Sequence, residues 1–216
     1  VIAQLSLLVK NAPKHRNNPA FIDDMINTTE HAVRKMTNVV EHIRRPNTDD
    51  GDECKSVNLT ELINDLVVLH QHQSPVPQLE EPLPIATVKA DSERLRSVLG
   101  HLIQNAQDAT PTDGEIILTL KIAKGNVVLF IQDTGCGMTE EFINSHLFKP
   151  FQSTKGLTGM GIGAYQAREY IQRLGGSIDV TSEPGLGSCF SVRIPLAPGE
   201  VPKPLEQRFP PISDTT

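Results

Sequence analysis

The sequence predicts an α+β protein in which a helical hairpin precedes a mixed domain of strands and helices. Residues 22–43 carry apolar side chains at helical spacing, and residues 116–132 alternate like the arms of a β-hairpin. Two glycine clusters follow, at 133–137 and 159–163. Glycines at alternate positions let a backbone turn sharply and approach a ligand closely, because no Cβ intervenes. The clusters therefore indicate contact with a nucleotide at its base and at its phosphates.

Residues 1–45 are expected to form the helical hairpin. Pro13 and the polar stretch 15–19 connect an apolar stripe in residues 1–12 to a longer stripe with an unbroken spacing of three and four. Faces this wide are hard to bury within one hairpin, so a second copy of the chain is favoured as partner over packing onto the same chain. The residues with this spacing are Ile22, Met25, Thr29, Ala32, Met36, Val39 and Ile43, and Ile26, Val33 and Val40 beside them widen the stripe.

Composition places the domain boundaries. The polar, turn-rich residues 46–56 are interpreted as a linker, and residues 57–198 as a second domain. Residues 199–216 contain several prolines and little apolar content, so we expect them to be loosely ordered.

The second domain is expected to contain three helices and several strands. Asn58 or Thr60 would cap the first helix, and Asp91 or Ser92 the second. The expected helices are 59–69, 92–109 and 164–174, and the expected strands are 85–88, 116–122, 127–132, 177–181 and 188–194.

Composition also excludes several classes of protein. The 216 residues are 38% hydrophobic with a net charge of −6, and acidic and basic residues are mixed, so no nucleic-acid partner is expected. Three cysteines without ligand spacing favour a reducing, cytoplasmic location, with Cys136 and Cys189 as small apolar fillers. No apolar run approaches the roughly 20 residues needed to cross a bilayer, although the parent protein could be membrane-anchored elsewhere.

Helix 92–109 carries a candidate metal ligand. Asn105 and Asp108 lie one turn apart on a face different from the apolar one. A neutral amide oxygen is a suitable hard ligand for Mg²⁺, which leans on phosphate oxygens and waters. Taken alone, Asn105 would be interpreted as a surface amide.

In order along about 100 residues, five motifs resemble the N, F and three glycine boxes of sensor histidine kinases. These kinases belong to the GHKL superfamily, whose ATP site is the Bergerat fold, an α/β sandwich. The segment 159–169, together with residues 3–8, is most similar to kinases of PEP-CTERM systems. The motifs are Asn105-Ala with Asp108-Ala, Asp133-x-Gly135-x-Gly137, Phe148-x-Pro-Phe151-x-Ser-Thr-Lys155, Gly159-x-Gly161-x-Gly163 and Gly185-x-Gly187-Ser188-x-Phe190.

The resemblance implies a role for each motif. Asp133 would accept a hydrogen bond from the adenine amino group, Asn105 would hold Mg²⁺, and Lys155 would supply positive charge near the phosphates. Residues 139–158 would form an ATP lid in which Phe148 and Phe151 either set the pose or simply pack. The implied ATP-binding residues are Asn105, Asp108, Asp133, Gly135, Gly137, Lys155, Gly159, Met160, Gly161, Ile162 and Gly163, with Asn105 and Lys155 as the catalytic pair.

Two departures from the family pattern qualify the resemblance. His101 stands where these kinases often carry asparagine and where hydrolysing relatives carry a glutamate that activates water; it would touch Mg²⁺-bound water or, slightly favoured, only pack. No histidine has the His-Asp/Glu pattern of the phosphoacceptor on the first hairpin helix. We expect that histidine just upstream of Val1, so this chain would not autophosphorylate.

The expected function is therefore that of the ATP-binding catalytic portion of a two-component sensor histidine kinase. It would bind Mg·ATP or ADP, dimerise through the hairpin, and pass a phosphoryl group through a histidine to a response regulator. The alternatives are a GHKL ATPase that hydrolyses ATP to drive a conformational cycle and a non-catalytic nucleotide-binding scaffold.

Overall fold

A computed structural model describes residues 2–15, 18–19, 21–29, 32–33, 54–152 and 161–198. The chain divides into two compact units. One comprises Val1–Gly51 with Phe151–Gly161, and the other comprises Asp52–Pro150 with Ile162–Thr216.

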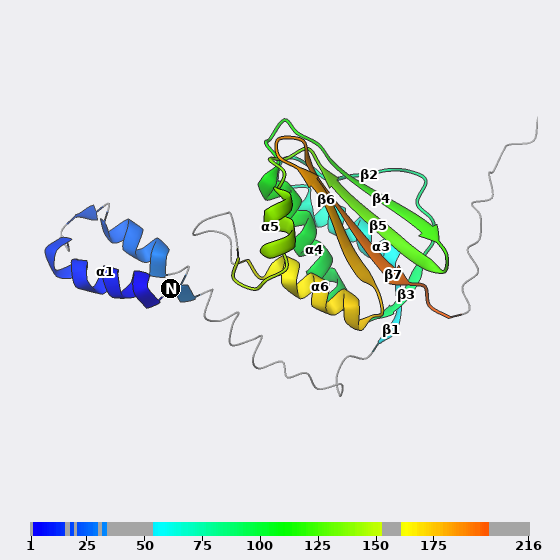
Figure 1. Cartoon of the computed structure of the whole chain (residues 1–216), viewed down its shortest axis with the longest axis horizontal. Coiled ribbons are helices and arrows are strands. Elements are labelled where there is room, and N and C mark those ends of the chain that lie inside the picture. Colours follow the sequence, from blue (N-terminus) through cyan, green and yellow to red (C-terminus); the bar gives the residue numbers. More distant parts are fainter. Residues whose placement is uncertain are drawn as a thin grey trace, which may run out of the picture. The chain divides into compact units, whose positions relative to one another are not determined.

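The first unit contains helix α1, Ile2–His15, and further helical residues at 21–29 (Figure 1). The connection was expected to begin at Pro13, but α1 continues through this proline to His15. A proline in the last turn forfeits only one hydrogen bond, which explains why the helix tolerates it. Stripe positions Met36, Val39, Val40 and Ile43 lie outside the described residues.

The second unit is built on a five-stranded mixed sheet with the order β2-β4-β5-β7-β6. Only β2 and β4 are parallel, and every other neighbouring pair is antiparallel. A separate pair joins β1, Lys55–Asn58, to β3, Thr87–Ala90. The strands of the large sheet are β2 Gln78–Leu79, β4 Ile116–Ala123, β5 Asn126–Asp133, β6 Ser177–Glu183 and β7 Gly187–Pro195.

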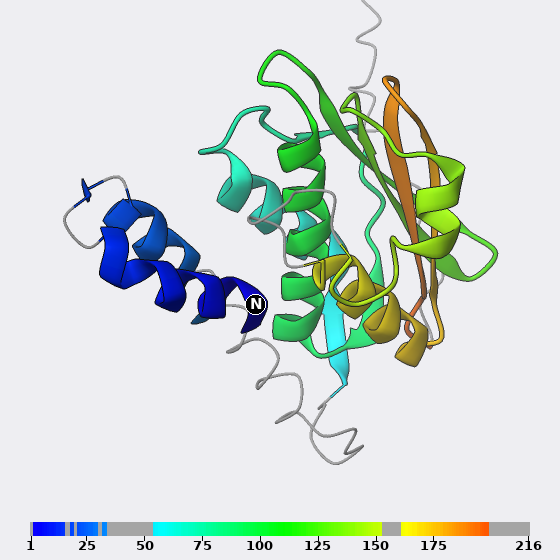
Figure 2. The same ribbon diagram turned by 60° about the vertical axis from the view of Figure 1, so that its left-hand side comes forward.

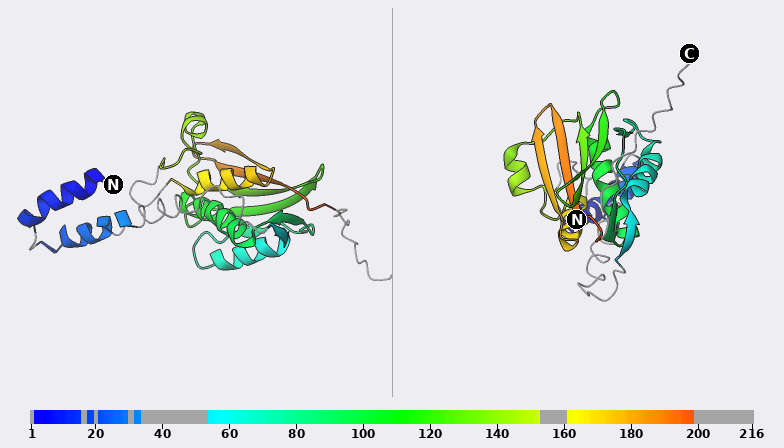
Figure 3. Two further views of the ribbon diagram at one scale, coloured as in Figure 1. Left: turned by 90° about the horizontal axis from the view of Figure 1, so that it is seen from below. Right: turned by 90° about the vertical axis from the view of Figure 1, so that its right-hand side faces the viewer.

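Helices α3, Leu59–His70, α4, Ser92–Ala109, and α6, Gly163–Arg173, lie on one side of this sheet (Figure 2). The views from below and from the side in Figure 3 show the same layering. The core fills the space between helices and sheet. Its fully buried side chains include Leu59, Ile63, Leu99, Leu102, Ile103, Leu118, Leu129 and Ile131.

Capping residues fix where the helices start. The Asn58 side chain accepts hydrogen bonds from the backbone of Thr60 and Glu61, and Asp91 accepts one from Arg94. The buried Tyr170 hydroxyl donates to the carbonyl of Asp91 and accepts from its N–H, which ties α6 to the start of α4. Of the expected caps, Asn58 and Asp91 are therefore confirmed.

Short elements depart from the expected plan. Strand β1 begins at Lys55, inside the segment expected to be linker, and β3 lies two residues later than its expected position. Strand β2 and helix α5, Glu140–Ser145, were not expected at all. Helix α5 buries no residue and spans six, so it leaves no apolar periodicity in the sequence.

Candidate nucleotide site

Asp133, the last residue of β5, lies buried at one end of the candidate site. Its Oδ1 accepts hydrogen bonds from the N–H of Gly135, at 2.9 Å, and of Ser188, at 3.2 Å. Burial raises the pKa of Asp133, and the two backbone hydrogen bonds oppose that rise. Both bonds end on Oδ1, so among the described residues no donor occupies Oδ2. The carboxylate is thus fixed with one oxygen available to a ligand.

The loop after Asp133 is fastened to the elements around it. The N–H of Cys136 donates to the carbonyl of Ala109 at the end of α4, 3.0 Å away. Gly185, in the turn between β6 and β7, donates to the carbonyl of Cys136 at 2.8 Å. The N–H of Met138 donates to the Ser182 hydroxyl at 2.8 Å. These bonds hold the carboxylate between α4 and the β6–β7 hairpin.

Glycines in this region make room for neighbouring backbone. A Cβ on Gly135 would lie 2.5 Å from the Ala109 carbonyl oxygen. Gly137 has φ of +65°, and its Cβ would lie 2.0 Å from the carbonyl oxygen of Glu183. Gly187 has φ of +100° and would meet the Asp133 carbonyl oxygen at 2.0 Å. The glycines at these positions are thus required by the packing of the loop itself, whether or not a ligand is bound.

The start of α6 forms a second part of the candidate site. A Cβ on Gly163 would lie 3.3 Å from the His101 Cβ and 3.9 Å from the Asn105 amide nitrogen. His101 and Asn105 are one turn apart on α4, so both side chains border the first turn of α6. The N-cap residue of this helix, Ile162, makes no capping hydrogen bond with its side chain. The backbone N–H groups of the first turn of α6 are suited to bind an anion, and the neighbouring Asn105 amide is suited to a cation bound to that anion.

His101 is held in its neutral form by its surroundings. Desolvation of the ring lowers the pKa of His101, although the residue keeps part of its surface exposed. A neutral imidazole is therefore expected at neutral pH.

Asp108 points to a different set of partners. Its Oδ1 accepts hydrogen bonds from the Gln104 amide, at 2.7 Å, and from the Gln73 amide, at 3.4 Å. Gln73 belongs to the segment that follows α3, and Gln104 also donates to the Gln73 side chain at 2.9 Å. Asp108 thus links α4 to this segment, a structural role that its position in the motif does not reveal.

The buried Gln107 also holds the segment that follows α3, a role that no motif in the sequence indicates. Its buried amide nitrogen donates to the carbonyls of His70, Gln73 and Pro75, at 2.9 to 3.1 Å. Its Oε1 therefore accepts, and the His70 Nδ1 donates to it at 2.8 Å. His70 is thus partly buried and bonded.

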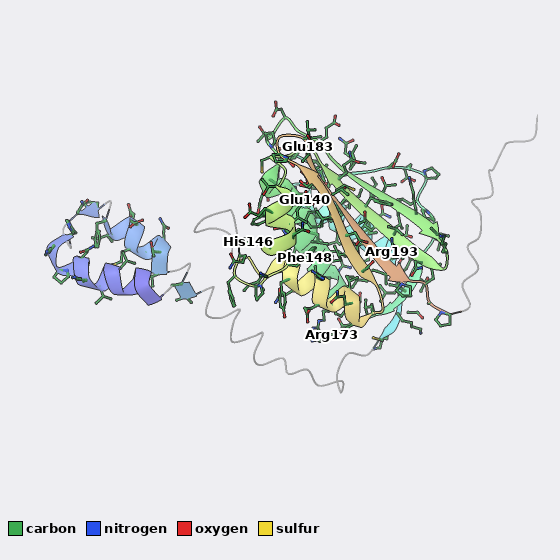
Figure 4. All side chains as sticks on the ribbon, in the orientation of Figure 1. Glu140, His146, Phe148, Arg173, Glu183 and Arg193 are labelled. Atoms are coloured by element: carbon green, nitrogen blue, oxygen red, sulfur yellow. The ribbon has the colours of Figure 1, made fainter. Side chains whose placement is uncertain are left out.

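The two phenylalanines of the expected lid differ from each other. Phe148 packs partly buried against the core, and the Arg168 guanidinium of α6 lies over its ring, 4.8 Å from the centroid. Figure 4 shows Phe148 between α5 and α6. Phe151 is 48% exposed and has φ of +67°. Phe148 thus serves as a packing residue within the expected lid, whereas Phe151 remains half exposed.

Several expected site residues lie outside the described part of the chain. Lys155, Gly159 and Met160 are among them. Gly161 is described within the first unit, where its φ is +62° and the Gln152 carbonyl oxygen lies 2.2 Å from its would-be Cβ. Ile162, which precedes α6, is buried.

One expectation about the cysteines is wrong. Cys136 is exposed and is therefore no apolar filler, because its loop turns the side chain outward. Cys189 is half-buried, and burial, with the nearby Asp133 charge as a smaller cause, raises the pKa of its thiol. The described cysteines form no disulfide.

The match to a family model shows to which family the chain belongs. The model of histidine kinase-, DNA gyrase B-, and HSP90-like ATPases matches residues 90–198, a range that contains Asn105, Asp133 and Gly163. The chain belongs to this ATPase family. The family's domain implies ATP binding, and its α+β Bergerat fold, expected from the motifs, is confirmed.

Curated relatives within the family are sensor proteins. TorS of Escherichia coli K12 is 33% identical over 132 residues, which are 60% of this chain and 14% of TorS. SrrB of Staphylococcus aureus is 36% identical over 110 residues, which are 49% of this chain and 19% of SrrB. The chain thus spans less than a fifth of either relative. The resemblance to the PEP-CTERM subfamily stays a prediction.

Solved structures of histidine kinases share the fold. The catalytic domain of histidine kinase ThkA, 29% identical, has a TM-score of 0.59 and covers 66% of this chain and 95% of that domain. ThkA in complex with the response regulator protein TrrA, 26% identical, has a TM-score of 0.67 and covers 91% of this chain and 58% of ThkA. The ATPase domain described here is thus similar to the catalytic domain of a histidine kinase. Within the described residues, no helix combines the length and apolar character needed to span a bilayer.

Proposed function

We propose that this chain binds Mg·ATP and positions its γ-phosphoryl group for transfer to a histidine, from which the group passes to an aspartate of a response regulator. The observation that carries the proposal is the buried Asp133 carboxylate, fixed by two backbone amides on Oδ1 and open to a ligand on Oδ2. A carboxylate oxygen accepts hydrogen bonds only, which matches the amino group of adenine. Guanine and hypoxanthine present a carbonyl at that position and would be rejected.

The phosphates would lie at the start of α6. Uncapped backbone N–H groups at a helix N-terminus favour negative charge, and Asn105 borders them. A single amide oxygen from Asn105 fits Mg²⁺, because this ion keeps several waters and needs few protein ligands besides phosphate oxygens. Asn105 would hold the ion, which neutralises charge on the triphosphate when bound. Gly161, Ile162 and Gly163, with Lys155, Gly159 and Met160, are proposed to complete the phosphate contacts.

Catalysis by these residues would rest on position and charge. Phosphoryl transfer needs an in-line approach and stabilised oxygens more than covalent chemistry from the protein. Asp133 would fix the base, and Asn105 and Lys155 would fix the phosphates, so that the γ-phosphoryl group faces its acceptor. His101 lies beside Gly163, and its lowered pKa favours the neutral imidazole, so it would add no charge next to the phosphates.

The hairpin is proposed to join two copies of the chain. Val9, Ile26 and Val33 are 73%, 54% and 56% exposed within the first unit, an apolar surface that a second hairpin would cover. The ThkA–TrrA complex supports a response regulator as a further partner. Light scattering at micromolar concentration should give twice the chain mass, and a monomer would exclude this interface.

Calorimetric titration tests the nucleotide site. ADP with Mg²⁺ should bind, and Asp133→Asn should weaken it about 100-fold, because a charged hydrogen bond is replaced by an amide that can donate. Asp179→Asn is the matched control, since this exposed carboxylate on β6 contacts only Arg193 at 3.9 Å among the described residues. Equal affinities of all three proteins would refute adenine recognition by Asp133.

Two further assays separate the kinase from its rivals. With γ-labelled ATP, no stable label should appear on this chain, because none of its histidines has the acceptor pattern. Sustained phosphate release would favour the hydrolysing alternative. A chain that binds no nucleotide would favour the scaffold alternative.

A further inference from the structure

The Ser182 hydroxyl on β6 lies where three separate segments meet. The N–H of Met138, at the end of the loop after Asp133, donates to its Oγ at 2.8 Å. The carbonyl oxygen of Gly187 lies 2.8 Å from the same Oγ, and the Ser188 Oγ lies 3.0 Å from it. One half-buried hydroxyl therefore contacts both segments that converge on Asp133.

The direction of each bond follows from the available protons. A serine hydroxyl has one proton and two lone pairs. A carbonyl can only accept, so the proton of Ser182 must point to Gly187. Ser182 then has only lone pairs left, and the proton between the two hydroxyls belongs to Ser188. Ser182 is thereby saturated, with one bond donated and two accepted.

This arrangement leads directly to the carboxylate. Ser188 donates its hydroxyl proton to the Ser182 Oγ and its backbone N–H to the Asp133 Oδ1. Ser188 also faces Asp133 in the register of β5 and β7. On the other side, Met138 ends the loop whose Gly135 N–H binds the same Oδ1. Ser182 thus bonds both segments that carry the donors to Asp133, through Met138 on one side and Ser188 on the other.

We propose that Ser182 is a positioning residue for base recognition: its hydroxyl orients Ser188 and the loop from Gly135 to Met138, and so aims the free oxygen of Asp133 at the adenine amino group. The inference rests on the proposed function, because it assigns the rigidity of that site to a residue that need not touch the nucleotide. Neither the family match nor the motifs assign a role to Ser182.

The test uses variants of the full chain. Ser182→Ala removes the hydroxyl, and Ser182→Thr keeps it as a rescue. Ser177→Ala is the matched control, because this serine on the same strand bonds only Arg193, at 3.2 Å, among the described residues. Ser182→Cys, of similar volume but weak hydrogen bonding, gives the same comparison if the alanine variant does not fold.

Two measurements are made on each protein. The first is the carboxyl pKa of Asp133 by carbon-detected NMR without nucleotide, which a role limited to global stability would not move. It should rise in Ser182→Ala, because the hydrogen bonds that oppose the rise weaken. The second is the ratio of ADP to inosine diphosphate affinity by calorimetry, which should fall about fivefold. Ser182→Thr and Ser177→Ala should match the wild-type protein in both.

The outcomes separate the inference from the proposed function. An unchanged Asp133 pKa and an unchanged affinity ratio in Ser182→Ala would overturn the inference while wild-type binding of ADP upholds the site. A wild-type protein that binds neither nucleotide would overturn the proposed function, and the role of Ser182 in base recognition with it. A change in Ser177→Ala as large as in Ser182→Ala would also overturn the inference.

Discussion

The two ends of the candidate site are built in different ways. Around Asp133, glycines meet backbone: Gly135 faces the Ala109 carbonyl and Gly137 that of Glu183, at 2.5 and 2.0 Å from their would-be Cβ atoms. At the start of α6, Gly163 meets the side chains of His101 and Asn105, at 3.3 and 3.9 Å. The overlaps with backbone around Asp133 are too deep to be relieved, whereas at Gly163 a shift of a few tenths of an ångström would suffice. The base end is thus rigid by construction, and the phosphate end is set by side chains.

The largest effect on the free energy of unfolding is expected from Gly137→Ala. This substitution should cost at least about 3 kcal/mol of unfolding free energy, because it combines positive φ with a backbone clash. Gly125→Ala is the control, since Gly125 has φ of +76° but nothing within 4 Å, and it should cost about 1–2 kcal/mol. Urea unfolding measures both. Equal costs would show that the backbone contact at Gly137 is unimportant.

Acid should weaken the base end. Burial raises the pKa of Asp133, so its ionised form is lost at a higher pH than for an ordinary aspartate. Because Oδ1 is occupied by two N–H groups, the added proton would go to Oδ2 and turn this acceptor into a donor. ADP affinity is therefore full above this pKa and should fall up to about tenfold per pH unit below it. In calorimetry the Asp133→Asn variant should lack this component of the pH profile, and identical profiles would contradict the assignment.

The phosphate end should depend on Asn105. Asn105→Ala should weaken Mg·ATP binding about tenfold, or about 1.4 kcal/mol, while leaving adenosine binding unchanged. Asn64→Ala on α3 is a matched control, because its amide bonds only the Thr60 carbonyl at 2.9 Å among the described residues. Titrations with and without Mg²⁺ provide the comparison. A loss of adenosine binding in Asn105→Ala would place Asn105 at the base instead.

The smallest effect is expected at Gly163. A Cβ there meets the His101 Cβ at 3.3 Å, so Gly163→Ala should reduce Mg·ATP affinity only about twofold. His101→Gly in the same chain removes that Cβ and should restore the affinity, and a double-mutant cycle would measure the relief. Abolished binding in Gly163→Ala, unrelieved by the second substitution, would mean that the start of α6 is as rigid as the base end.

The sequence predicted the long elements because each combines a cap with sustained periodicity. Asn58 and Asp91 begin helices where expected, and the hairpin of β4 and β5 turns at Gly125. Strand β1 could not be predicted, since only Val57 of its four residues is buried and its partner β3 is distant in sequence. A strand with one buried position carries no recognisable alternation.

Motif spacing singled out the residues of the candidate site, but it does not show the contacts that hold them. Asp133 and Asn105 were found through the spacing of motifs, and the structure places them on β5 and α4. Asp108 was implied to bind ATP, and this stays a prediction; its hydrogen bond from Gln73, which lies far away along the chain, could not be predicted from the motif. The proposed role of Ser182 has no sequence signal either, because it depends on two segments that only the fold brings together, the loop ending at Met138 and the start of β7.

We propose that one adenine nucleotide binds between the Asp133 loop and the start of α6. An amide NMR titration of the chain with ADP and Mg²⁺ tests it most directly. We expect saturable chemical-shift changes at Gly135, Ser188 and Gly163 and none at Lys121, an exposed residue of β4. Saturation of the chain with ADP without chemical-shift changes at Gly135 and Ser188, or changes centred on Lys121, would contradict binding at this site.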